Sequence, residues 1–127
     1  MRDSLLLAAA AIALGGPASA QQPAVFNVQL SNFKFAPSEI VLDHGQPYVL
    51  RLANAADGGH DFTAREFFAA AAVAADDRHY ISDGEVEVPP GQVREIHLTA
   101  PAAGKYRLKC THSLHKLMGM SGRIIVR

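Results

Sequence analysis

The chain lacks tryptophan, has a single cysteine and carries no net charge. One cysteine cannot form an internal disulfide, so in an oxidising compartment its thiol is either buried or bound to something. Balanced charge gives no electrostatic basis for nucleic-acid binding. Beyond the first twenty residues, no apolar run reaches the roughly 20 residues that cross a bilayer. We therefore expect neither a nucleic-acid partner nor a membrane span in the processed chain.

The first twenty residues have the pattern of a secretory signal peptide. Arg2 supplies a short charged start, Leu5–Leu14 is the apolar stretch, and Ala18–Ala20 is a small-residue cleavage site. We predict cleavage after Ala20 and export to the periplasm, with an uncleaved lipid-facing anchor as the alternative. Residues 21–127 then form one domain, which is long enough for a single hydrophobic core.

Short runs of alternating or β-branched residues follow one another along this domain, with turn residues between them. Strands of this length and spacing predict an all-β sandwich or barrel. The alternation predicts strands at Val25–Leu30, Phe33–Phe35, Glu39–Leu42, Tyr48–Leu52, Glu85–Val88, Val93–Leu98, Tyr106–Cys110 and Arg123–Val126.

One alanine-rich segment, residues 64–77, breaks this alternation. Alanine is the best helix former, so the segment predicts one short helical insertion in the β-fold. Its Phe67 and Phe68 would cover one edge of the core. We interpret the insertion as structural rather than ligand-binding.

The only cysteine opens the most informative part of the chain, its closing segment. His115 follows Cys110 by five positions, and Met120 follows His115 by five more. A thiolate, an imidazole and a thioether on one short loop are ligands that select copper over magnesium, calcium or manganese. Alternation places Tyr106, Leu108 and Cys110 on one face of a strand, so the thiol points toward the apolar side.

A second imidazole would complete the metal site, and His60 is the candidate. It follows Gly58 and Gly59 in a predicted loop, far from the closing segment in sequence. A lone histidine is more often a surface or core residue, but three further donors in the closing segment favour a ligand role here. The same closing segment holds six cations and no carboxylate from Lys105 onward, so we expect cations close to the metal.

Three alternatives stay open at this level. His112 is an extra imidazole, although Cys-x-His is a tight spacing for two ligands of one ion. Met118 is a rival axial ligand at His-x2-Met spacing, whereas Met120 is followed in register by the Gly122-containing strand motif. Zinc would accept the thiolate and the imidazoles, but a thioether as the fourth ligand argues against it.

On these residues the chain resembles the cupredoxins, the small blue-copper proteins of the plastocyanin and azurin type. The Cys-x4-His-x4-Met spacing is similar to that of longer-loop members such as rusticyanin. The sequence departs from the family at Ser113-Leu114, where a proline is common. The motifs that carry the resemblance are Phe33-Lys34-Phe35-Ala36-Pro37, Gly45, Asn54 ahead of His60, Gly104-Lys105-Tyr106, and Met120-Ser121-Gly122-Arg123-Ile124-Ile125-Val126.

The resemblance implies a Greek-key β-sandwich that holds one type-1 copper ion. Carried over residue by residue, its ligands are His60, Cys110, His115 and Met120. It further implies a monomeric periplasmic carrier of single electrons, with a cytochrome or copper enzyme docking near His115. The alternative is a copper-binding protein for tolerance, sequestration or delivery, which the spare donors would favour. We expect no enzyme activity, because four protein ligands leave no open position for a substrate.

Overall fold

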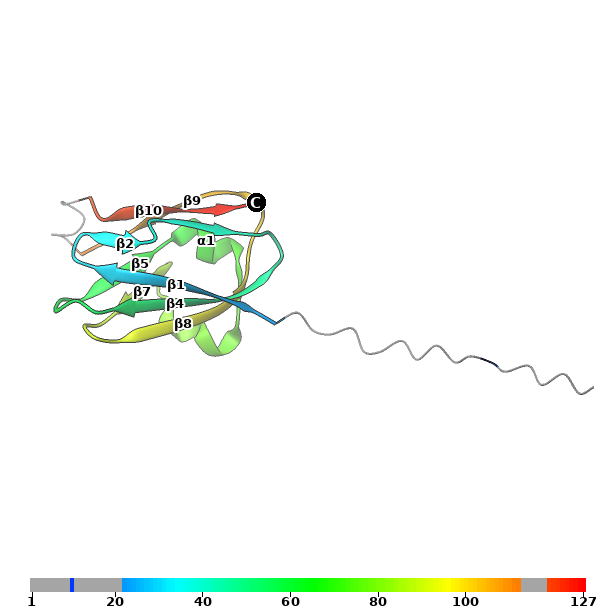
Figure 1. The fold of residues 1–127 in the computed structure, drawn as a ribbon, viewed down its shortest axis with the longest axis horizontal. Helices are drawn as coiled ribbons and strands as arrows, with labels where there is room; N and C mark the ends of the chain where they lie inside the picture. Colours follow the sequence, from blue (N-terminus) through cyan, green and yellow to red (C-terminus); the bar gives the residue numbers. More distant parts are fainter. Residues whose placement is uncertain (1–9, 11–21, 113–118) are drawn as a thin grey trace, which may run out of the picture.

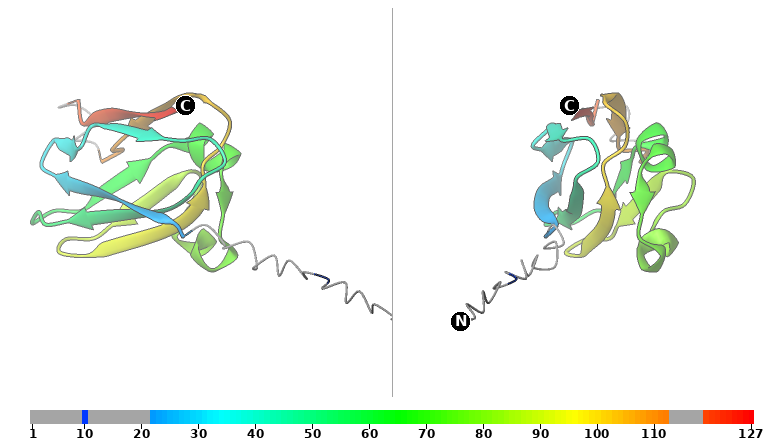
Figure 2. Two further views of the ribbon diagram at one scale, coloured as in Figure 1. Left: turned by 45° about the vertical axis from the view of Figure 1, so that its right-hand side comes forward. Right: turned by 90° about the vertical axis from the view of Figure 1, so that its right-hand side faces the viewer.

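The strands form two five-stranded sheets that lie face to face (Figures 1 and 2). The computed structural model describes Ala10 and residues 22–112 and 119–127. The first sheet has the order β2-β1-β4-β8-β6 and the second has the order β3-β10-β9-β5-β7. The strands are β1 (Ala24–Ser31), β2 (Lys34–Ala36), β3 (Glu39–Leu42), β4 (Pro47–Asn54), β5 (His60–Thr63), β6 (Ala72–Val73), β7 (Glu85–Val88), β8 (Val93–Thr99), β9 (Gly104–Lys109) and β10 (Ser121–Val126).

The sandwich confirms the all-β prediction, and each of the eight strands expected from alternation is present. Two pairings are parallel, namely β1 with β4 and β3 with β10, and the other strand pairs are antiparallel. The chain changes sheets at every connection from β2 to β9, whereas β1 pairs with β2 and β9 pairs with β10 within one sheet, and one core lies between the two layers.

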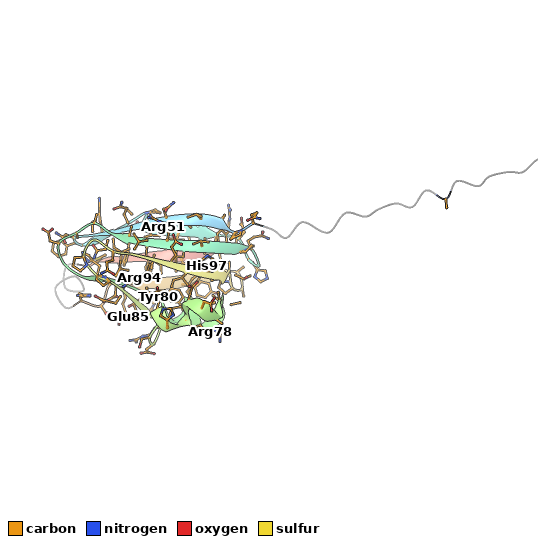
Figure 3. All side chains as sticks on the ribbon, turned by 90° about the horizontal axis from the view of Figure 1, so that it is seen from below. Arg51, Arg78, Tyr80, Glu85, Arg94 and His97 are labelled. Atoms are coloured by element: carbon orange, nitrogen blue, oxygen red, sulfur yellow. The ribbon has the colours of Figure 1, made fainter. Side chains whose placement is uncertain are left out.

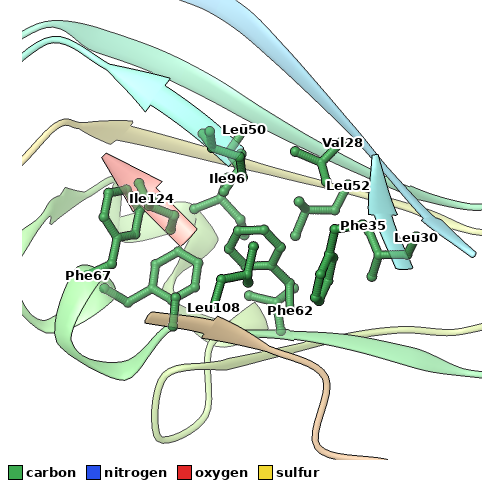
Figure 4. Close-up of a cluster of buried hydrophobic side chains, with 14 of the residues drawn as sticks. Val28, Leu30, Phe35, Leu50, Leu52, Phe62, Phe67, Ile96, Leu108 and Ile124 are labelled. Carbon is green, nitrogen blue, oxygen red and sulfur yellow. The ribbon is translucent and has the colours of Figure 1, made fainter. Parts of the chain in front are cut away.

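Alternate residues of the strands build that core (Figure 4). Val86 and Val88 of β7, for example, point inward, while Glu85 and Glu87 do not belong to the core. Phe62 lies at its centre and makes edge-to-face contacts with Phe35 and Phe68. Such aromatic pairs add to the free energy gained from burying their area.

The alanine-rich insertion differs from the single helix that the sequence predicts. It consists of the helix α1 (Arg65–Ala70), the strand β6 and the 3-10 helix η1 (Ala75–Tyr80). The helix ends early because Ala71 is already extended and β6 pairs with β8, so the sheet edge takes the backbone hydrogen bonds. Phe67 and Phe68 are buried in the core, as the sequence predicts.

In the part of the chain that the structure describes, no helix has the length and apolar character needed to cross a membrane.

Candidate metal centre

His60 is the first residue of β5 and is fully buried. The prediction that it lies in a loop is therefore wrong. Sequence alternation misses β5 because all four of its residues are buried, the outer pair as well as the inner pair. Phe62 points into the core, and residues two apart share a face, so His60 is on the inner face too.

Asn54, at the end of β4, holds the turn that leads to His60. Its side-chain amide donates hydrogen bonds of 2.9 Å to the carbonyl oxygens of Gly58 and Val88. Its side-chain oxygen accepts a hydrogen bond of 2.9 Å from the backbone N–H of Ala56. This asparagine is nearly fully buried, so each bond replaces one to water and fixes the path of the chain.

Cys110 directly follows β9, and its thiol is fully buried on the inner face. The sulfur accepts a hydrogen bond from the backbone N–H of Asp61 at 3.5 Å. Burial raises the pKa of the Cys110 thiol, and the nearby carboxylates of Asp61 and Glu87 raise it further. Backbone N–H groups of Asp61 and His112 act in the opposite direction but do not cancel the effect of burial on the pKa.

Met120 is brought beside Cys110 by the pairing of β9 with β10. Ser121 pairs with Lys109, and the backbone N–H of Cys110 donates to the Met120 carbonyl oxygen at 3.1 Å. The Met120 side chain is buried in the core. The turn before it passes through Gly119 at a φ of 75°, a conformation that glycine adopts without strain.

The start of β10 is anchored on its other side by a close backbone approach. The backbone N–H of Arg123 donates to the Ser38 carbonyl oxygen at 2.9 Å. A Cβ atom on Gly122 would collide with that same carbonyl group. Only glycine fits there, so Gly122 sets how tightly the strand after Met120 packs against the chain before β3.

The structure thus brings three of the four predicted ligands to one end of the sandwich. His60, Cys110 and Met120 lie where β5 and β10 begin and β9 ends, toward the left of Figure 1. His115 and the rival ligand Met118 lie outside the described residues. The complete ligand set therefore stays a prediction.

His112 lies on the other face of the sheet from the thiol. Its ring Nε2 is 3.0 and 3.1 Å from the two carboxylate oxygens of Glu87. Glu87 alternates with the core residues Val86 and Val88 and therefore projects outward. In this structure the imidazole faces carboxylates, and the suggestion that it shares an ion with Cys110 gains no support.

Asp61 is a central residue of this region that sequence reasoning missed. Its carboxylate is fully buried and receives hydrogen bonds from the Thr63 hydroxyl at 2.7 Å and from Thr111. Thr111 contributes both its backbone N–H, at 2.9 Å, and its hydroxyl, at 2.7 Å. The carboxylate therefore ties β5 to the residue after Cys110. The only sequence feature that could have pointed to this network is that Asp61 is next to His60 and Thr111 is next to Cys110.

Carboxylates, rather than the expected cations alone, surround this network. Glu85 and Glu87 extend from β7 beside Asp61. Burial raises the pKa of Glu85, and the charges of Asp61 and Glu87 raise it further. The distribution of charge along the sequence did not predict these carboxylates near Cys110, because they come from β7, which the fold places next to β5.

A sandwich with a buried imidazole, thiol and thioether at one end defines the class of the cupredoxins. The family model for the cupredoxin-like domain matches residues 4–126. The chain belongs to this family. The match begins inside the predicted signal peptide, and the cleavage site stays a prediction.

Solved structures of similar fold include two auracyanins. The dithionite-reduced auracyanin of Roseiflexus castenholzii has 18% identity and a TM-score of 0.63, over 84% of this chain and 99% of that one. Auracyanin A of Chloroflexus aurantiacus, described as a "blue" copper protein, has 20% identity and a TM-score of 0.58, over 84% and 100% of the two chains. At such identities the likeness concerns the fold alone.

A multicopper oxidase from Campylobacter jejuni shares the fold over part of its length. It has 10% identity and a TM-score of 0.63, and the match covers 84% of this chain but only 31% of the oxidase. A search among curated proteins found no match.

Proposed function

We propose that the protein is a type-1 copper protein that carries single electrons in the periplasm. The observation that supports this best is the bond from Asp61 to the Cys110 sulfur, which joins a buried thiol to the residue next to a buried imidazole. The auracyanin described as a "blue" copper protein has the same fold, which adds support by analogy.

The chemistry of the donors fits copper. His60, Cys110 and His115 would supply the trigonal set of two imidazoles and a thiolate, and Met120 would supply a weak axial thioether. When bound, copper supplies one-electron chemistry between Cu(I) and Cu(II). Magnesium and calcium prefer oxygen ligands and would find none in this set.

The residues around the site would keep the donors in place. Asn54 fixes the turn before His60, and Asp61 links β5 to Thr111 next to the thiol. Hydrogen bonds from two backbone N–H groups to the sulfur favour its thiolate form. A rigid site costs little reorganisation when charge changes, and such sites suit electron transfer.

The alternative is copper tolerance, sequestration or delivery without electron transfer. The His60, Cys110 and Met120 side chains are buried, so a protein that delivers copper would have to open this end of the sandwich to pass the ion on. For that reason we favour the electron carrier. His112, the spare imidazole that supported copper handling, is engaged with Glu87 in the structure.

We further propose that a redox partner, a cytochrome or a copper enzyme, docks near His115. Lys109 and Arg123 are exposed on neighbouring strands β9 and β10 and would steer an anionic partner. Association should then weaken as salt is added. We expect the exported protein to act as a monomer and not as an enzyme.

Voltammetry of the copper-loaded protein, combined with a copper-transfer assay, tests this function. An electron carrier gives a reversible one-electron wave and keeps its copper when an apo acceptor protein is added. Met120→Leu should shift the potential substantially, whereas Met118→Leu should not. Transfer of copper to the acceptor without a reversible wave would instead establish the delivery role.

A further inference from the structure

We propose a second metal site, for a zinc-like divalent cation, on the outer face of the second sheet. Its ligands would be Asp61 of β5, Glu87 of β7 and His112, which comes two residues after Cys110. One ligand atom from each of the three side chains lies within 4.8 Å of the other two. Two carboxylates and one imidazole form a mixed oxygen and nitrogen set that zinc accepts.

The distances between these donors suit a single small ion. Nε2 of His112 is 3.0 Å from a Glu87 oxygen and 3.7 Å from Oδ2 of Asp61. Zinc bonds of 2.0–2.2 Å in tetrahedral geometry place neighbouring ligand atoms roughly 3.4 Å apart. The two distances from His112 bracket that value and the third lies within 4.8 Å, so side-chain movement of about an ångström would bring the donors to one ion, and water would complete the coordination.

The Asp61 carboxylate is already oriented for such a role. Thr63 and the Thr111 backbone N–H bind its Oδ1, and the Thr111 hydroxyl binds its Oδ2 at 2.7 Å. Ligating carboxylates are commonly held by further hydrogen bonds of this kind. Since the carboxylate is fully buried in this network, its position does not have to be fixed by the ion.

Gly59 leaves the space that Glu87 and His112 occupy. A Cβ atom at this position would lie 2.9 Å from Oε1 of Glu87 and 3.3 Å from Cε1 of His112. Both approaches are tighter than ordinary van der Waals contact. A side chain at residue 59 would therefore push apart two of the three proposed ligands.

The negative charge around the proposed site also favours binding of a cation. Asp61, Glu85 and Glu87 crowd one corner of the sheet, and burial together with the two neighbouring charges raises the pKa of Glu85. Across residues 22–112 and 119–127, no lysine or arginine forms an ion pair with any of these carboxylates. A bound dication would offset the repulsion between them.

This site is separate from the proposed copper centre. Its side chains lie on the outer face of the sheet, whereas Phe62, which is the neighbour of Asp61 in β5, and the Cys110 side chain face the core. A bound ion would link β5, β7 and the segment after β9. The inference does not depend on the proposed function, because it uses none of the four proposed copper ligands.

Calorimetric titration of the full chain with Zn²⁺ tests the proposal. Cys110→Ser serves as the background, because it removes the thiolate that would also attract zinc. In this background we expect one zinc site, and we expect His112→Gln or Glu87→Gln to weaken it at least tenfold. His97→Gln is the matched control, since that exposed histidine contacts the single carboxylate of Asp77. It should leave zinc affinity unchanged.

Equal zinc affinity in Cys110→Ser with and without His112→Gln would overturn the proposal, as would zinc binding that Cys110→Ser abolishes. Thermal melts of each variant check that it is folded. Glu87→Gln alters a half-exposed side chain, so it tests the site even if the histidine variant misfolds. A shift of the Gly59, Glu87 and Thr111 backbone signals in NMR spectra on zinc addition would locate the ion.

Discussion

The two faces of β5 and of the chain around Cys110 carry different kinds of side chain. Inward, His60 and the thiol are buried in an apolar core next to Phe62. Outward, Asp61 and Thr111 form a polar network that reaches Glu87 through His112. The inner face carries the side chains that we propose as copper ligands, and the outer face holds the strands that carry them. Because strand side chains alternate, a shift of one residue in register would exchange the two sets.

A substitution on the inner face should have the largest effect on stability. Phe62→Ala removes a fully buried ring that contacts Phe35 and Phe68. We expect a loss of about 3–5 kcal/mol in the free energy of unfolding, measured in urea. Val25→Ala is the control, since the Val25 side chain is 57% exposed and its loss should change stability by no more than about 0.5 kcal/mol. Equal losses would mean that the core is not where the structure places it.

A substitution on the outer face should have the second-largest effect on stability. Asp61→Ala leaves the buried donors of Thr63 and Thr111 without their acceptor, which costs about 1–3 kcal/mol for each unsatisfied group. Asp61→Asn keeps an acceptor oxygen and should recover part of the loss. Urea denaturation of the two variants measures the difference. If alanine and asparagine were equivalent, hydrogen bonding at this carboxylate would not hold the strands together.

Removing a histidine–carboxylate pair away from the proposed copper centre should have the smallest effect on stability. Asp77 accepts hydrogen bonds of 2.8 Å from the backbone N–H and the ring of His97. The position of His97 is labelled in Figure 3. Burial alone would raise the pKa of Asp77, but these bonds and the charge of the ring outweigh burial and lower it. The folded state therefore favours the ionised carboxylate, and the resulting stability is present above the usual aspartate pKa.

That contribution is lost as the pH falls through the lowered pKa of Asp77. Asp77→Asn should be less stable than the parent by under about 1 kcal/mol at neutral pH, since single exposed pairs contribute little. The difference should vanish in acid, and thermal melts from pH 7 to pH 2 would follow it. Copper binding should not change in this variant, which separates the pair from the centre near Cys110.

The alternation of apolar residues was enough to predict most of the strands and the sandwich. It failed at β5, where Asp61 and Thr63 are buried on the outer face and leave no polar–apolar pattern. The helical insertion was placed correctly but not its end, because pairing of β6 with β8 overrides the preference of alanine for helix.

For the site, residue chemistry and spacing indicated His60, Cys110 and Met120, and the fold brings these three together. The outer network was not predictable, because Asp61 and Thr111 are 50 positions apart in sequence. The same holds for His112 and Glu87, which are 25 positions apart. Contacts of this kind depend on the register of β5 with β7 and β9, which no local pattern specifies.

The most direct test is the absorption and EPR spectrum of the copper-loaded protein beside that of its Cys110→Ser variant. A type-1 centre at His60, Cys110, His115 and Met120 predicts a strong visible thiolate-to-copper band in the parent. The variant should lack that band and bind copper more weakly. Absence of the band in the parent, together with unchanged copper affinity in Cys110→Ser, would contradict the proposed copper centre.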